Sequence, residues 1–301
     1  MLLHYTIPHH MTGLRLDEAL AVLGQISKGE ARRIIDRGGC ALNKAMVRVA
    51  SRQVKEGDQL DAGVMEPGRF QELLLPDEAI LYQDAELIAL AKPSGIPSQR
   101  TPYQLKGTLE YWVTQYFQSA GSNEPARVVH RLDRGTSGVM LFPRHRQGAA
   151  RLSNLFRDGL IGKYYLLLVA GTPETLTWEV DAPIGKIAPA RWGVHPAGRS
   201  AKTSFRVLAT QGGLSLVGAI PHTGRTHQIR VHMAHSTGLA ICGDSTYGGA
   251  PAARLLLHCH ALCLTDMRGA PLTIVADLPP DMAVDWGEEK GDCAGWWLCD
   301  R

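Results

Sequence analysis

The first 62 residues carry a hydrophobic pattern of two helices followed by a small hairpin. A first helix ending at Gly24 is predicted by apolar residues at helical spacing, namely Leu16, Ala19, Leu20 and Leu23. A capping box from Ser27 to Glu30 predicts the start of a second helix, because each side chain can accept the other residue's backbone N–H. Gly38-Gly39 ends that helix. Short strands are expected after it, over 40–42, 46–49 and 59–60.

From residue 76 onward, strand-like and helix-like stretches do not alternate strictly. Asp84 marks a turn between two strands within 80–91, and further strands are predicted over 163–171, 214–220 and 255–264. Helices are predicted over 109–117, 148–159 and 226–236. This order favours an α+β domain whose mixed, largely antiparallel sheet is flanked by helices, joined to the small N-terminal α/β unit.

Four segments follow from these patterns. A first domain spans 1–62, a linker 63–75, a second domain 76–285, and a C-terminal tail of unknown role 286–301. The composition, with 45% hydrophobic and 20% charged residues, is typical of a folded globular chain. The sequence has no apolar run of membrane-span length and no signal-peptide pattern at its start, so a cytoplasmic protein without membrane partners is expected.

The six cysteines are expected to be reduced thiols rather than a disulfide framework. Cys259 and Cys263 alternate with His258 and His260, which raises the question of a metal site. Alternation along a strand over 255–264 places the two histidines on one face and the two cysteines on the other, so the four side chains diverge. No metal is therefore expected.

Charge is distributed unevenly along the chain. Residues 27–55 and residues 127–163 each contain eight Lys or Arg against two acids, which gives +6 for each block. Residues 277–301 contain seven acids against two bases, which gives −5. Two basic blocks favour a polyanionic partner such as nucleic acid, although a solvated helix face would account for either block alone.

Two segments carry candidate chemistry. In the first, 128–142, apolar stretches flank a polar centre where Asp133 lies between Arg131 and Arg134, which favours an ionised carboxylate. An Asp that only organises a turn explains the same residues equally well. In the second, 221–234, Gly224 gives a tight entry to a helix that starts near Thr226. Ile229 and Met233 are expected inward, and Arg230 at the rim of that stripe. The spacing of His227, His232 and His235 is not that of a zinc-binding pair, so they are interpreted as polar helix residues.

The N-terminal unit resembles the S-four RNA-binding domain. Its pattern is Arg15-Leu-Asp17, the basic second helix, Asn43 in the hairpin, and Gly57-Asp58. The family usually has Asn-Gly in that hairpin. Lys44 replaces the glycine here, and because lysine fits positive φ poorly, a longer turn is expected. RNA contacts are predicted from the cations of this unit, namely Lys28, Arg32, Arg33, Arg37 and Lys44.

The second domain resembles the RluA-type family of RNA pseudouridine synthases. The resemblance is carried by His130-Arg-Leu-Asp133 with Thr136-Ser-Gly138, and by Thr223-Gly-Arg-Thr-His-Gln-Ile-Arg230. Further pieces occur in order, namely Lys92-Pro-Ser-Gly-Ile-Pro97, Gly107-Thr108, Lys163-Tyr-Tyr165, Gly243-Asp244 with Tyr247-Gly248, and Leu278-Pro-Pro-Asp-Met282. The match covers about residues 80 to 283.

The resemblance implies isomerisation of uridine within RNA, with no cofactor and no metal. It makes Asp133 the essential carboxylate, acting as a nucleophile or as a base. It makes Arg230 its cationic partner, and Tyr165 the ring that stacks on the target base, with Tyr164 pointing the other way. Arg131 would fill the gap left by the flipped uridine. Substrate contacts are expected from Arg131, Arg134, Thr136, Arg225 and His227.

Members of that family with an S-four-like domain often act on large-subunit ribosomal RNA, which makes this the first expected target and transfer RNA the second. A monomer is expected. Two other readings stay open: a non-catalytic RNA-binding assembly factor with the same fold, and an unrelated hydrolase that uses Asp133 with His130 or Ser137.

Overall fold

The computed structural model describes residues 2–36, 38–63, 73–100 and 107–283. The predicted linker over 63–75 lies largely outside these ranges, and the predicted tail over 286–301 lies wholly outside them. The chain divides into two compact units. The first unit is Met1–Leu74 with Gln99–Tyr116, and the second is Leu75–Ser98 with Phe117–Arg301.

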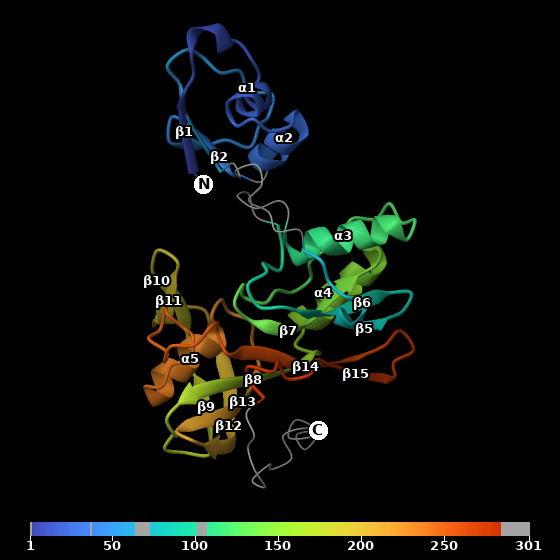
Figure 1. Cartoon of the computed structure of the whole chain (residues 1–301), viewed down its shortest axis with the longest axis vertical. Helices are drawn as coiled ribbons and strands as arrows, with labels where there is room; N and C mark the ends of the chain where they lie inside the picture. The colour runs from blue at the N-terminus through green and yellow to red at the C-terminus, as the bar shows by residue number, and fades with distance from the viewer. Residues whose placement is uncertain (1, 37, 64–72, 101–106, 284–301) are drawn as a thin grey trace. The chain divides into compact units, whose positions relative to one another are not determined.

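The first unit contains an antiparallel sheet in the order β1-β4-β2-β3, with two helices (Figure 1). Its elements are β1 Leu2–Thr6, α1 Leu16–Leu23, α2 Lys28–Asp36, β2 Cys40–Leu42, β3 Ala45–Met46 and β4 Gln59–Gly63, with a short 3-10 helix over His9–Met11. Leu16, Leu20, Ile35 and Leu60 are fully buried in its core. Ser27 Oγ accepts the Glu30 N–H at 3.2 Å, and the Glu30 carboxylate accepts the Ser27 N–H at 3.3 Å, so the predicted capping box is confirmed.

Three features of this unit differ from those predicted from the sequence. The strand predicted over 46–49 is shorter and comprises only Ala45–Met46. Strand β1 was not expected, and it pairs with the whole of β4. The hairpin turn is also shorter than expected. Leu42 pairs with Ala45, and Asn43 and Lys44 both adopt positive φ, 52° and 67°. Asn43 fixes this turn, because its side chain donates to Asp58 and accepts the Gln59 N–H, both at 2.8 Å.

A sheet of nine described strands organises the second unit, in the order β5-β6-β7-β14-β8-β13-β12-β9, with β15 on β14. The strands are β5 Ile80–Gln83, β6 Leu87–Lys92, β7 Ser137–Pro143, β8 Gly162–Ala170, β9 Thr177–Asp181, β12 Lys202–Gln211, β13 Leu214–Pro221, β14 Leu257–Thr265 and β15 Pro271–Val275. Among these described strands only β7 and β14 pair in parallel; the other pairs are antiparallel. The predicted α+β class with a mixed, largely antiparallel sheet is confirmed.

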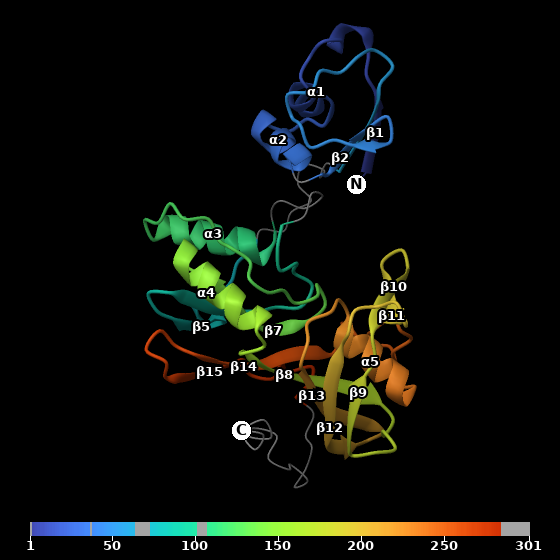
Figure 2. The ribbon, with the colours of Figure 1, turned by 180° about the vertical axis from the view of Figure 1, so that it is seen from behind.

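Helices are placed against both halves of this sheet (Figures 1 and 2). Helix α4 (Arg146–Arg157) contacts β7, and helix α5 (Gln228–Thr237) contacts β12, β13 and strand β11. Strands β10 (Ile184–Ala188) and β11 (Arg191–Val194) form a separate antiparallel hairpin. Helix α3 (Leu109–Ser119) spans the boundary of the two units, because its residues up to Tyr116 belong to the first unit. A short 3-10 helix covers Asp77–Ala79. Strand β14 joins the two halves of the sheet, because it pairs with β7 of the half formed by β5, β6 and β7 and with β8 of the half formed by β8, β13, β12 and β9.

The junction of β7 and β14 requires glycine at position 138. Gly138 has a φ of +113°, and a Cβ there would lie 2.1 Å from the carbonyl oxygen of Cys259. No side chain fits this space, and L residues rarely adopt this φ. The close approach fixes the point at which the polar segment 128–136 enters the sheet.

The strand predicted over 255–264 forms as β14, but its faces are not the ones that strict alternation gives. A bulge between Cys259 and Ala261 interrupts the pairing with β8. Cys259 therefore shares an apolar cluster with Leu262, whereas Ala261 and Cys263 pack with Tyr164. Within the described residues no group of three or more metal-ligating side chains occurs. No described helix is both long and apolar enough to cross a membrane.

Candidate active site

A pocket of about 770 Å³ lies in the second unit, lined by the segment 129–136, α4, β8 and the start of α5. Pockets of this size accommodate small-molecule groups. Among its described lining residues are six cations and a single carboxylate, Asp133. The cations are Arg131, Arg157, Lys163, Arg199, Arg225 and Arg230. Such a lining attracts a polyanion while leaving one acid for chemistry.

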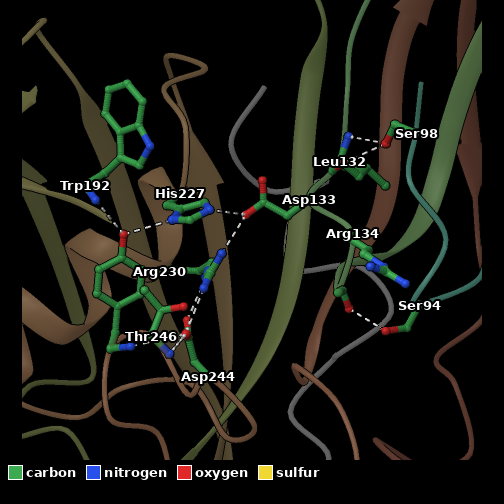
Figure 3. Close-up of polar contacts among 12 residues, drawn as sticks. Ser94, Ser98, Leu132, Asp133, Arg134, Trp192, His227, Arg230, Asp244 and Thr246 are labelled. Carbon is green, nitrogen blue, oxygen red and sulfur yellow. Dashed lines mark hydrogen bonds and ion pairs between the residues drawn. The ribbon is translucent and has the colours of Figure 1, made fainter. Parts of the chain in front are cut away.

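Asp133 is held from one side by Arg230 (Figure 3). Arg230 Nη1 donates to Asp133 Oδ2 at 3.1 Å. The same guanidinium donates to Asp244 through Nε at 2.6 Å and Nη2 at 2.8 Å. Arg230 is only 8% exposed and Asp244 only 2%, so this ion pair is largely shielded from water. Asp244 therefore fixes Arg230 in the orientation that presents Nη1 to Asp133.

Asp244 is itself fixed by its own turn. Its Oδ1 accepts the backbone N–H groups of Thr246 at 3.1 Å and Tyr247 at 3.3 Å. Gly243 before it has a φ of +78°, and a Cβ there would lie 1.7 Å from the carbonyl oxygen of Arg254. Burial lowers the pKa of Arg230, but the hydrogen bonds and charge of Asp244 and the charge of Asp133 outweigh it and raise that pKa, so the guanidinium stays charged.

The loop that carries Asp133 rests on the segment 92–98. Lys92 is 1% exposed, and its Nζ donates to the carbonyls of Pro93 at 2.9 Å, Thr136 at 2.7 Å and Arg134 at 3.3 Å. Ser98 Oγ donates to the Leu132 carbonyl at 2.6 Å and accepts the Leu132 N–H at 3.0 Å. The backbone on both sides of Asp133 is thereby held in place. Burial lowers the pKa of Lys92 to about 7.

Tyr165 is half-buried on β8 and lines the pocket, whereas Tyr164 packs in a different cluster with Ala261 and Cys263. The predicted opposition of the two tyrosines is confirmed. Burial raises the pKa of Tyr165 well above its usual value, and the Cys259 thiol and the Asp133 charge raise it further. The hydroxyl therefore remains protonated at neutral pH.

His227 lies beside Asp133, outside the regular helix. Its φ of 57° places it in the left-handed region, immediately before α5. Its Nε2 lies 3.7 Å from Asp133 Oδ2, and its Nδ1 lies 2.9 Å from the Tyr247 hydroxyl. Burial lowers the pKa of His227, although the Asp133 charge opposes this shift, so the ring is neutral near pH 7.

The other predicted substrate-binding residues divide into two groups. Arg131, Thr136 and Arg225 line the pocket with His227. Arg131 is exposed, and Arg225 Nε donates to the Ser200 carbonyl at 2.9 Å. Thr136 is buried, and its hydroxyl has no hydrogen-bond partner in the part of the chain that the structure describes. Arg134 is not among the lining residues, because its Nε donates to the Gly95 carbonyl at 2.8 Å and supports the loop instead.

Three predictions about helix α5 were wrong, namely its first residue, the position of Arg230 and the exposure of His232. It begins at Gln228, because the Gln228 side chain accepts the Arg225 N–H at 2.9 Å and closes a turn before the helix. Arg230 is buried and does not lie at a rim. His232 is fully buried, with its ring bonded to the Thr203 hydroxyl and to the Ala182 carbonyl. Six consecutive residues of this helix are buried, so its sequence has no simple apolar stripe.

The hydrolase hypothesis requires His130 or Ser137, and neither contacts Asp133 within the described ranges. His130 Nε2 accepts the Leu141 N–H at 2.8 Å, and burial lowers its pKa to about 3. Ser137 Oγ is bonded to His258 and Arg254. A Ser–His pair therefore exists, but Ser137 is buried and is not a pocket-lining residue. The geometry disfavours a hydrolase.

In the first unit, the predicted RNA-binding cations lie on the surface. Lys28, Arg32, Arg33 and Lys44 are all exposed, and Arg37 lies outside the described residues. Lys28 pairs with Glu18 at 2.7 Å, and Arg32 approaches Asp36 at 3.9 Å. Exposed pairs of this kind are weak and exchange readily for a phosphate.

The sequence patterns predict no role for Asp244, Tyr247 or Lys92, although each lies in a short segment that carries the family resemblance. Glycines beside Asp244 and Tyr247, and a proline after Lys92, were the signals of constrained backbone, but no sequence spacing links these residues to Asp133.

Known proteins resemble this chain in both of its units. Residues 86–235 match the family model described as RNA pseudouridylate synthase, and residues 14–60 match the S4 domain. An uncharacterised RNA pseudouridine synthase of Zymomonas mobilis is 36% identical over 66% of this chain and 93% of its own length. The ribosomal large subunit pseudouridine synthase D of Nitrosomonas europaea is 30% identical over 92% of this chain and 85% of its own.

A solved structure, human RNA pseudouridylate synthase domain containing 4, is 25% identical with a TM-score of 0.58, covering 67% of this chain and 89% of that one. The predicted family is thus confirmed by sequence models, by relatives and by fold. The chain belongs to the RluA-type family of RNA pseudouridine synthases and carries an N-terminal S4 domain.

Proposed function

We propose that this RNA pseudouridine synthase uses Asp133 as its essential carboxylate and acts on uridines of large-subunit ribosomal RNA. The observation that carries the first part is the ion pair between Asp133 and the buried Arg230 at 3.1 Å in a pocket lined by cations. Arg230 holds the carboxylate in one orientation and places a positive charge beside it.

The reaction rearranges bonds within one nucleotide. The bond between N1 of uracil and C1′ of ribose breaks, the base rotates, and a bond from C5 to C1′ forms. The hydrogen on C5 is lost and N1 gains a proton, so nothing is oxidised. A carboxylate serves this sequence of steps either as the nucleophile or as the base, and Arg230 orients Asp133 for either role.

The remaining pocket residues have roles that follow from their positions. The half-buried ring of Tyr165 offers a stacking surface for the flipped base, and its protonated hydroxyl is a donor. Exposed Arg131 is suited to fill the space that the uridine leaves. Thr136 and Arg225 are suited to contact the nucleotide, whereas Arg134 supports the loop.

Two observations favour ribosomal RNA as the target. A relative that matches 92% of this chain is named for the large ribosomal subunit. The S4 domain also presents exposed cations on α2 and in its hairpin, which fit an RNA backbone. Transfer RNA is the second candidate target.

Tritium release tests the proposed chemistry. RNA labelled at uridine C5 should lose tritium with the wild-type chain, and Asp133→Asn should reduce release to background while leaving circular dichroism unchanged. Release by Asp133→Asn would contradict the role of the carboxylate. Absence of release by the wild type on total cellular RNA would instead favour the non-catalytic assembly factor.

Pseudouridine mapping tests the target. Cells that lack the protein should lose pseudouridine at specific large-subunit positions, and the wild-type gene should restore it. Loss confined to transfer RNA would replace the ribosomal assignment with the second candidate and would leave the role of Asp133 intact.

A further inference from the structure

One side of the pocket contains a chain of polar contacts, two hydrogen bonds and one longer ion-pair contact, that ends at Asp133 (Figure 3). It begins at the backbone N–H of Trp192 on β11, which donates to the Tyr247 hydroxyl at 3.3 Å. That hydroxyl lies 2.9 Å from His227 Nδ1. The other ring nitrogen, Nε2, faces Asp133 Oδ2 at 3.7 Å.

These contacts select one tautomer of the neutral ring. Tyr247 accepts from Trp192, so its own proton is free to be donated to Nδ1, which places the ring proton on Nε2. The opposite tautomer would leave the Tyr247 proton without a partner among the described residues. It would also direct the Nε2 lone pair at a carboxylate. Both ends of the chain therefore favour Nε2–H.

The backbone supports a specific function for this ring. His227 adopts the left-handed conformation, which most residues avoid, and its side chain makes no capping hydrogen bond to α5. The ring also meets Tyr247 edge-on, with centroids 5.7 Å apart. Its position is thus fixed by Tyr247 and Asp133 rather than by the needs of the helix.

We propose that His227 is a positioning residue for Asp133. Its Nε2–H is oriented by the chain from Trp192 through Tyr247 and faces Asp133 Oδ2 at 3.7 Å, beside the direct hydrogen bond from Arg230 Nη1 at 3.1 Å. Oδ1, which has no hydrogen bond from any described residue, is then the reacting oxygen. The inference rests on the proposed role of Asp133 in the reaction.

Two substitutions at one position separate the donor from the rest of the ring. His227→Asn keeps an acceptor for the Tyr247 hydroxyl and tolerates the left-handed backbone, but it removes the donor facing Asp133. His227→Gln reaches further and restores an N–H at that place. We expect kcat to fall about tenfold in His227→Asn and within about threefold in His227→Gln, with KM for RNA changed less than about twofold. Tyr247→Phe should lower kcat about fivefold, because the tautomer is no longer fixed.

The exposed His235 of the same helix provides the control, and His235→Gln should match the wild type. A higher KM with unchanged kcat in His227→Asn would indicate an RNA contact and would overturn the proposal. Equal loss of kcat in the Asn and Gln variants would also overturn it, because the donor would then make no difference.

Nuclear magnetic resonance tests the tautomer without any turnover. Long-range proton–nitrogen spectra of the histidine-labelled full chain near pH 7.5 should show the Nε2–H form for His227, assigned by its disappearance in His227→Gln. Tyr247→Phe should shift it to a mixture, and Asp133→Asn should leave Nε2–H predominant. A wild-type ring in the Nδ1–H form would overturn the inference alone, whereas turnover by Asp133→Asn would overturn the proposed function.

Discussion

The cations of the S4 domain and those of the synthase pocket are used in opposite ways. On α2, the side chains of Lys28 and Arg32 are 56% and 65% exposed, and their acidic partners are exposed or half-exposed. In the pocket, Arg230 is buried between Asp133 and Asp244. Lys92, outside the pocket lining, is buried against three carbonyls, two of them in the loop that carries Asp133. The first set contributes charge, whereas the second set contributes fixed geometry.

This difference determines how each set should respond to substitution. An exposed ion pair contributes at most about 1 kcal/mol to folding, and its loss changes only long-range attraction. Breaking a buried pair leaves a charge without a partner in a poorly solvated site, which costs about 3–5 kcal/mol. The largest effects should therefore arise in the pocket.

Arg230→Ala should give the largest effect, in both stability and activity. It removes the partner of the buried Asp244 as well as that of Asp133, so the free energy of unfolding should fall by about 3–5 kcal/mol and turnover should be lost. Urea unfolding of the full chain measures the first effect and tritium release the second. Arg32→Ala is the matched control and should lose less than about 1 kcal/mol. Equal stability of the two variants would show that the pocket cation is as replaceable as the surface one.

Features of the fold that depend on neighbouring residues could be predicted from the sequence. The capping box at Ser27, the turn at Asp84 and the end of α1 at Gly24 each depend on neighbouring residues, and each is observed. Strand β1 and the bulge in β14 depend on partners far along the chain, so local patterns did not contain them. Lys44 at positive φ is the same case, because Asn43 holds the turn through Asp58.

The candidate site was likewise predicted only in part. Asp133, Arg230 and Tyr165 are brought into one pocket, as the family resemblance implied. The supporting residues Asp244 and Lys92 were not assigned roles, because their partners lie 14 and more than 40 positions away. Burial of Arg230 and His232 was also missed, since a helix enclosed on several sides shows no apolar stripe.

Tyr165→Phe should lower kcat about 100-fold, provided that the hydroxyl takes part in the reaction. Its neighbour gives a matched control, because Tyr164 lies on the same strand but packs away from the pocket. Tyr164→Phe should keep kcat within about threefold, so the pair tests position with identical chemistry. Single-turnover tritium release measures both variants. Equal rates for the two would place the role of Tyr165 in its ring rather than its hydroxyl.

The stability of the second unit should depend on pH through the buried His258. Burial lowers the pKa of His258 to about 4, below its unfolded value of about 6.5, so the unfolded chain binds the proton more readily. The stabilisation from this residue is present above pH 6.5 and is lost as the pH falls towards 4. Between pH 7 and 5 this loss is about 2 kcal/mol. His258→Gln should make urea stability less sensitive to acid by that amount.

The smallest effect is expected from the S4 domain, and it should appear in binding rather than in turnover. Replacing Lys28, Arg32 and Arg33 by Gln in the full chain removes three exposed charges without touching a buried contact. Each lost phosphate contact should reduce the slope of log affinity against log salt by about 0.7, so the slope should fall by about 2. Affinity for ribosomal RNA should weaken most at low salt, while kcat at saturating RNA stays the same.

Deletion of residues 1–62 should reproduce the change in slope and leave a folded synthase, since the S4 core is built from its own residues. Filter binding over a salt series measures both variants. If the triple variant lowered kcat at saturating RNA, the exposed cations would be acting through geometry as the buried ones do, because charge alone changes encounter and affinity but not the rate of a bound substrate. An unchanged salt slope in both variants would instead assign the polyanion contacts to the pocket cations alone.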